Sequence, residues 1–186
     1  FNADEYDDLA ITVWRPGASA TSDVVVVYGS AWGLLTHNAS TVSPSVPSVS
    51  QNEVGNALAA GDLNGDGIDE LVMGALCLEV SGQACAGAFF VAPGTASGID
   101  VSAVQRHDLD SLGVAGGPAA QDWLGVALAV ADFNGDGLGD VAVGAPLRTS
   151  GDPVLVVNGS GSGLDPATAR MLDVQADYPA LDVGGA

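Results

Sequence analysis

The chain has 186 residues, a formal net charge of −19, and 4 Lys and Arg residues against 23 Asp and Glu residues. A protein that binds nucleic acid needs a basic surface against the phosphates, so this balance excludes that class of partner. No run of about 18 uncharged apolar residues occurs, so the sequence predicts no direct membrane insertion. The apolar fraction of 47% comes largely from Ala and Val, whose small side chains suit closely stacked sheets.

The first 50 residues contain patterns typical of short strands joined by turns. Leu9 to Trp14 is a continuous apolar run that predicts a strand buried on both faces. Asp23 to Tyr28 is rich in valine and predicts a second strand. The turn Gly29 to Leu34 follows, and we expect Thr41 to Val49 to be an edge strand, where proline is tolerated.

The next segment, Gly55 to Leu76, reads GNALAAGDLNGDGIDELVMGAL and contains a loop with the pattern of a calcium site. Oxygen side chains fall at loop positions 1, 3, 5 and 9, and glycines at positions 4 and 6 permit a sharp bend. Ca²⁺ takes six to eight oxygen ligands at about 2.3–2.6 Å, which this alternation of donors supplies. The predicted ligands are the side chains of Asp62, Asn64, Asp66 and Glu70 and the backbone carbonyl of Ile68.

The same loop recurs in Gly125 to Pro146, which reads GVALAVADFNGDGLGDVAVGAP. Internal repetition of this kind fixes the architecture more firmly than any local pattern. The predicted ligands here are the side chains of Asp132, Asn134, Asp136 and Asp140 and the carbonyl of Leu138.

A third, shorter copy of the loop opens the chain, because residues 1–9 align with residues 133–141. Ala3 and Glu5 replace the two glycines, position 1 would precede Phe1, and a non-glycine residue at the turn is strained. Occupancy of this third site therefore stays open. Its predicted ligands are Asn2, Asp4 and Asp8 through their side chains and Tyr6 through its carbonyl.

Each loop is followed by an apolar strand, a turn, a second apolar strand, a glycine-rich turn and a more polar final strand. In the second and third units the second apolar strands are Ala88 to Ala92 and Val154 to Val157, and the final strands are Gln105 to Asp110 and Arg170 to Val174. Four short strands per unit, repeated without helical periodicity, are typical of β-propeller blades.

The sequence therefore predicts an all-β fold of about three blades, each of four antiparallel strands. The predicted division is blade 1 at residues 1–48, lacking its first strand, blade 2 at 49–110, blade 3 at 111–176, and the first strand of a following blade at 177–186.

The two complete motifs resemble the FG-GAP repeat of integrin α-subunit propellers and their bacterial relatives. Val54-Gly55 and Leu124-Gly125 stand for its initial Phe-Gly pair. Gly144-Ala145-Pro146 matches its final triplet, whereas Gly74-Ala75-Leu76 departs by one residue and Thr12-Val13-Trp14 departs fully. The resemblance implies a seven-bladed propeller with Ca²⁺ in inter-strand loops on one face and ligands usually bound on the other.

An EF-hand or dockerin loop is the alternative interpretation of the calcium motif, because such a loop also begins DxNxDG. That loop needs a bidentate acid at position 12 and a helix on each side. Position 12 is Met73 in one loop and Val143 in the other, each within a strand-like apolar run. The rival fails on both requirements.

The two cysteines, Cys77 and Cys85, are eight residues apart and flank the turn-like segment Ser81-Gly82-Gln83. A redox or metal-binding pair is the alternative, but the spacing is not CxxC and no histidine is nearby. We expect a disulfide that staples the connection between two strands, as in secreted proteins.

Three blades are too few for a closed ring, since propellers usually have four to eight. The segment Ala180 to Ala186 resembles the strand Ala127 to Ala131 that leads into a calcium loop. Two explanations stay open. The chain is part of a larger propeller, which we prefer, or the C-terminal strand of one copy completes the first blade of another and builds a homo-oligomer.

The pattern offers no catalytic centre. We expect His107 to be solvated on an outer strand and His37 to begin a Ser/Thr-rich connection without an acidic partner. Trp14, Trp32 and Trp123 are interpreted as packing between blades, with a carbohydrate-binding surface as the alternative.

We therefore predict a secreted, calcium-stabilised module that is not an enzyme and has a structural, adhesion or protein-recognition role. The alternatives are a non-catalytic or carbohydrate-binding appendage of a secreted enzyme, or a self-assembling subunit of a surface polymer. Whether the ligand is a protein or a glycan stays open.

Overall fold

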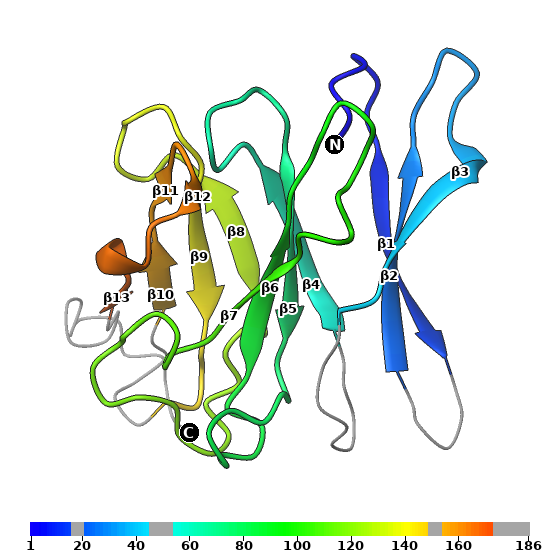
Figure 1. Ribbon diagram of the computed structural model, residues 1–186. Helices are drawn as coiled ribbons and strands as arrows, with labels where there is room; N and C mark the ends of the chain where they lie inside the picture. Colours follow the sequence, from blue (N-terminus) through cyan, green and yellow to red (C-terminus); the bar gives the residue numbers. More distant parts are fainter. Residues whose placement is uncertain (16–20, 45–53, 149–153, 173–186) are drawn as a thin grey trace, which may run out of the picture.

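The computed structural model describes residues 1–15, 21–44, 54–148 and 154–172. Within these ranges the regular elements are β-strands and one short 3₁₀ turn, Pro166–Thr168. The strands form three main antiparallel sheets that lie side by side (Figure 1).

The first sheet has the order β1-β2-β3. Its strands are β1 (Leu9–Arg15), β2 (Thr21–Tyr28) and β3 (Leu35–Val42). The prediction of an edge strand at Thr41 to Val49 is wrong in its start, because β3 begins directly after the turn and pairs Leu35 with Tyr28. Residues 45–49 of that prediction lie outside the described residues.

The second sheet follows the chain in the order β4-β5-β6-β7. Its strands are β4 (Val54–Gly61), β5 (Glu70–Ala75), β6 (Ala88–Ala92) and β7 (Gln105–His107). The strand expected at Ala88 to Ala92 is confirmed, whereas the final strand is shorter than predicted and ends at His107.

The third sheet repeats this order, with β8, β9, β10 and β13 as successive neighbours. A two-stranded ribbon, β11 with β12, follows β10. The strand predicted at Val154 to Val157 is confirmed. The elements are β8 (Leu128–Ala131), β9 (Asp140–Gly144), β10 (Val154–Val157), β11 (Gly159–Ser160), β12 (Gly163–Leu164) and β13 (Arg170–Leu172).

The expected all-β class with up-and-down antiparallel sheets is confirmed. Successive strands of each sheet are neighbours, as in propeller blades. The sheets form a row that does not close into a ring within the described residues (Figure 1). The predicted blade boundaries stay predictions, and the strand predicted at 177–186 lies outside the described part of the chain.

Two apolar cores hold the row of sheets together. One lies between the first and second sheets and contains Val24, Val26 and Met73. The other lies between the second and third sheets and contains Val72 and Val143. Met73 and Val72 enter different cores because successive side chains of β5 point to opposite faces of the sheet.

The predicted disulfide joins Cys77 to Cys85 in the connection between β5 and β6. It closes a tight hairpin in which the Gln83 N–H donates to the Val80 carbonyl at 2.8 Å. The Trp123 N–H donates to the Cys85 carbonyl at 3.2 Å, so the same connection anchors the segment that leads into the third sheet.

Candidate calcium loops

The three predicted calcium loops lie at the same end of their sheets (Figure 1). The second loop joins β4 to β5 and the third joins β8 to β9, while the first leads directly into β1. The loops therefore occupy equivalent places in three successive sheets.

One hydrogen bond is common to all three loops. The acidic side chain at position 9 accepts a bond from the main-chain nitrogen of the residue at position 2, which ties the start of the loop to its end. The backbone N–H groups of Leu63 and Phe133 donate to Glu70 at 2.8 Å and to Asp140 at 2.9 Å, and in the first loop the N-terminal ammonium of Phe1 pairs with Asp8 at 2.8 Å.

A glycine from the next connection supports the same acidic side chain. The Gly29 N–H donates to Asp8 at 2.8 Å and the Gly159 N–H donates to Asp140 at 3.0 Å. The Gly94 N–H likewise bonds to Glu70. A Cβ atom on any of these glycines would clash with the backbone carbonyl at loop position 8. Sequence reasoning saw these glycines recur in turns but missed this role.

The carboxylate at position 1 organises the middle of the complete loops. Asp62 accepts the N–H groups of Gly65 at 2.6 Å and Gly67 at 2.8 Å. Asp132 makes the equivalent bonds to Gly135 and Gly137, at 2.6 and 2.9 Å. These bonds, led by that from Gly137, lower the pKa of Asp132 although desolvation opposes them.

The first loop has the same backbone bend without the glycines. Ala3 and Glu5 have φ values of 56° and 69°, and the glycines at the equivalent positions of the other loops have values of 79° to 90°. The substitutions are therefore accommodated by a strained left-handed backbone at two non-glycine residues.

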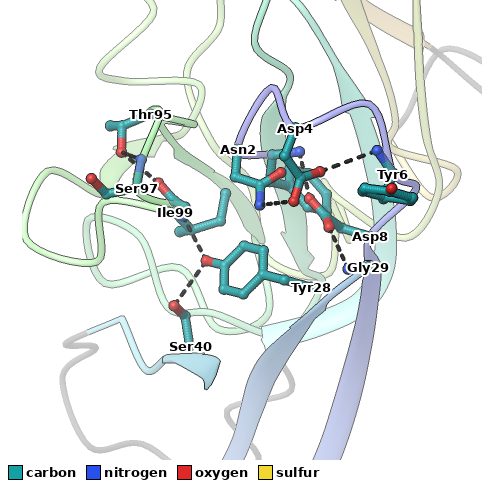
Figure 2. Close-up of polar contacts among 12 residues, drawn as sticks. Asn2, Asp4, Tyr6, Asp8, Tyr28, Gly29, Ser40, Thr95, Ser97 and Ile99 are labelled. Atoms are coloured by element: carbon teal, nitrogen blue, oxygen red, sulfur yellow. Dashed lines mark hydrogen bonds and ion pairs between the residues drawn. The ribbon is translucent and has the colours of Figure 1, made fainter. Parts of the chain in front are cut away.

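The side chain at position 3 differs between the loops. The Asn64 and Asn134 Oδ1 atoms each accept the backbone N–H two residues later at 2.8 Å. The Asn2 Oδ1 atom is buried and has no hydrogen-bond partner among the described residues, while its Nδ2 donates to Asp4 at 2.8 Å (Figure 2). An orphaned buried acceptor beside carboxylates is a position where a cation would be favourable.

Unbalanced negative charge accumulates in the second loop. The pKa of Glu70 is raised to about 7, chiefly by burial and in addition by the charges of Asp66 and Asp62, against the lowering effect of the N–H groups of Leu63 and Gly94. The Glu70 residue is only 2% exposed. A bound cation would remove this penalty, because it favours the ionised carboxylate.

The donor chemistry fits a hard cation, since each loop concentrates carboxylate, amide and carbonyl oxygens. Within the described ranges, however, no group of three or more His, Cys, Asp or Glu side chains is positioned to hold a metal ion. The carboxylates accept bonds from their own loops instead, such as those from Gly65 and Gly67 to Asp62. The structure brings the predicted ligands into common loops, and calcium binding stays a prediction.

The histidine and tryptophan expectations need correction. His107 is 8% exposed and stacks on Phe89 with a centroid separation of 5.1 Å, so it is not a solvated residue. Burial lowers its pKa, against the opposing effect of Asp108. His37 lies on β3 and is exposed. Trp14 and Trp32 are 62% and 91% exposed, so neither packs between sheets.

Comparison with known proteins agrees with this geometry. The model of the FG-GAP repeat matches residues 54–75 and 124–163, which contain the second and third loops. The chain is 35% identical over 136 residues to phosphatidylinositol-glycan-specific phospholipase D of Mus musculus, covering 73% of this chain and 16% of that protein. It is 30% identical over 159 residues to integrin alpha-8 of Gallus gallus, covering 79% of this chain and 14% of the relative.

A third relative, integrin alpha-7 of Rattus norvegicus, is 28% identical over 174 residues, which is 91% of this chain and 14% of that protein. The chain thus spans about a sixth or less of the length of these relatives. No helix in the described part is long and apolar enough to cross a membrane. The repeated loops, the up-and-down sheets and the family match together place the chain in the FG-GAP repeat family.

Proposed function

We propose that the chain is a calcium-stabilised extracellular module with a structural, adhesion or recognition role, and that it is not itself an enzyme. The observation that carries the proposal is the shared frame of the three loops. In each, an acidic side chain at position 9 is held by the main-chain nitrogen at position 2, which is the N-terminal ammonium in the first loop, and by a glycine of the next connection.

Calcium would be held by the position 1, 3, 5 and 9 side chains and the position 7 carbonyl of the second and third loops. The first loop would contribute its own donors, including the unpartnered Asn2 Oδ1. Neutralising these carboxylates would remove repulsion within each loop, so metal binding and folding would be coupled.

An extracellular location is supported by the disulfide and would suit the proposed calcium binding. Disulfides persist in oxidising compartments, and the chain contains the Cys77–Cys85 bridge. Extracellular calcium modules bind at about 10⁻⁴–10⁻³ M, a range in which occupancy follows extracellular calcium.

The role of the module is supported by the relatives. Their names include both integrin alpha subunits and a phospholipase, and the phospholipase match covers 16% of that protein. A repeat that occurs in proteins as different as these fits a non-catalytic recognition or structural unit. The ligand of such a unit would be a protein or a glycan.

Thermal unfolding with calcium and with EDTA tests the proposal. At calcium 100-fold above the dissociation constant we expect about 2.7 kcal/mol of stabilisation. Asp66→Asn should reduce the calcium-induced rise in the unfolding midpoint. Asp69→Asn is the matched control, because Asp69 is an exposed acid of the same loop that is not a predicted ligand. An unchanged midpoint and no heat of calcium binding by calorimetry would refute the proposal.

A further inference from the structure

A polar cleft of about 450 Å³ lies beside the first loop, at the junction of the first and second sheets. Its walls come from the first loop, the β2–β3 hairpin and the turn after β6, which contribute Asp4, Asn38 and Ser97 among others. This volume is within the range of about 300–1,000 Å³ typical of small-molecule sites.

Tyr28 holds the walls of the cleft in place (Figure 2). Its hydroxyl accepts the Ile99 N–H from the connection between β6 and β7 at 2.8 Å and lies 2.8 Å from the Ser40 hydroxyl on β3. The Tyr28 side chain is mostly buried, with 8% of the residue exposed. The cleft is therefore organised by bonds that cross the junction of two sheets.

The lining offers hydrogen-bonding groups and almost no charge. Among the described residues that line the cleft, Asp4 alone is charged, so an anionic ligand would be disfavoured. The exposed Asn38 amide and Ser97 hydroxyl bond to no other described residue. These donors and acceptors match the hydroxyl groups of a neutral ligand.

An exposed indole lies in the turn that forms one wall. Trp32 is 91% exposed, and its backbone N–H donates to the hydroxyl of Ser30, a lining residue, at 3.1 Å. The Gly33 N–H closes the same turn onto the Ser30 carbonyl at 2.9 Å. A tryptophan combines a large apolar surface with little flexibility, so one left in solvent, in a turn that contributes Ser30 to the cleft, is typical of a binding surface.

We propose that this cleft binds a neutral carbohydrate, with Trp32 stacking on the apolar face of a sugar ring at the rim and Asn38, Ser97 and Asp4 bonding to its hydroxyl groups. A sugar ring presents both kinds of surface at once, C–H groups on its faces and hydroxyl groups at its edge. The inference rests on the proposed recognition role and deepens it by naming the ligand class.

The test uses the full chain, fluorescently labelled, on an array of neutral oligosaccharides, sulfated oligosaccharides and an oligo-arginine peptide. The chain is prepared in a host without N-glycosylation, because Asn38-Ala39-Ser40 is a sequon. We expect binding to neutral oligosaccharides, confirmed by calorimetric titration of the strongest binder.

Trp32→Ala should weaken this binding about 10-fold or more, which corresponds to about 1.4 kcal/mol. Asn38→Ala should weaken it less. Trp14→Ala is the matched control, because Trp14 is also exposed but lies near the end of β1 farthest from the loop. It should bind as the unmodified chain does, and both tryptophan variants should keep the same unfolding midpoint.

Absence of binding to every neutral oligosaccharide would overturn the inference, as would equal effects of the two tryptophan substitutions. Preference for oligo-arginine would replace it with a site for cationic peptides, and preference for sulfated sugars would contradict the charge argument. The calcium measurement is separate: a chain stabilised by calcium that binds no sugar refutes this inference alone. Sugar binding without calcium stabilisation refutes only the calcium proposal.

Discussion

The first sheet and the other two sheets present equivalent residues to different surroundings. The first, third and fifth residues after the position 9 acid of the first loop are Leu9, Ile11 and Val13, which are 43%, 41% and 39% exposed. Their equivalents in the second and third sheets are at most 2% exposed. Those equivalents are Leu71, Met73 and Ala75, and Val141, Val143 and Ala145.

This difference shows that burial in the repeat depends on the adjacent sheet. Val24 and Val26 of the first sheet share a core with Met73. Val72 and Phe89 of the second sheet share a core with Val143. The face of the first sheet that carries Ile11 is equally apolar but partly exposed. The local sequence pattern is thus the same, and the tertiary neighbour decides its contribution to stability.

The largest expected effect on stability comes from comparing a substitution at the buried Met73 with one at the partly exposed Ile11. Met73→Ala should lower the free energy of unfolding by about 2–5 kcal/mol, because it leaves a cavity in a closed core. Ile11→Ala should cost less than about 1 kcal/mol, because its side chain is already partly exposed. Chemical denaturation measures both. Equal losses would mean that the Ile11 face is covered in solution, and sedimentation at several concentrations would then show whether a second copy covers it.

The glycines that support the loops should behave alike in every sheet. Gly94→Ala and Gly29→Ala should each cost about 1–3 kcal/mol, since the added methyl group would press on the carbonyl at loop position 8. Gly161→Ala is the control, because nothing lies within 4 Å of the position its Cβ would take. A tolerated Gly29→Ala beside a damaging Gly94→Ala would mean that the first loop lacks the common frame.

In EDTA, which removes calcium, the pH dependence of stability should report the cost of ionising the buried Glu70 side chain in the second loop. The pKa of Glu70 is raised from 4.5 to about 7, so the folded state binds the proton more tightly than the unfolded state. Stability from this group is present below pH 4.5 and is lost as the pH rises through about 7. We expect the unfolding midpoint in EDTA to fall by a few degrees over this window.

Glu70→Gln should remove that fall, and calcium should stabilise the unmodified protein more at pH 7.5 than at pH 5. His107, whose pKa is lowered by burial, contributes in the opposite sense, because stability is lost as the pH falls through its ordinary value. The comparison with Glu70→Gln separates the two groups. A pH profile identical in both proteins would contradict the account of Glu70.

The smallest expected effect concerns the backbone of the first loop. Glu5→Gly should raise stability by up to about 1 kcal/mol, because glycine adopts the left-handed φ of 69° without steric cost. Gly67→Ala, the reverse change at the equivalent position of the second loop, should lower stability by a similar amount. Differential calorimetry resolves both. A destabilising Glu5→Gly would mean that the glutamate side chain contributes a contact larger than the strain.

Several features of this molecule could be predicted from short stretches of the sequence. The alternation of oxygen side chains and glycines located the three loops, and runs of β-branched and small apolar residues located β6 and β10 to the residue. The disulfide also followed from a short, turn-like spacing between Cys77 and Cys85. These features depend on residues close in the chain, so a one-dimensional pattern contains them.

Other properties were decided by tertiary structure alone. β3 begins at Leu35 because it pairs with β2 directly after the turn, and His107 is buried because it stacks on Phe89 of the adjacent strand. Trp32 is exposed because its turn between β2 and β3 does not pack into either core. Each depends on which strand or sheet lies opposite, information that composition and periodicity do not contain. The repeat determined the positions of the side chains along each sheet, and the packing of the sheets determined which of them are buried and which are left to bind.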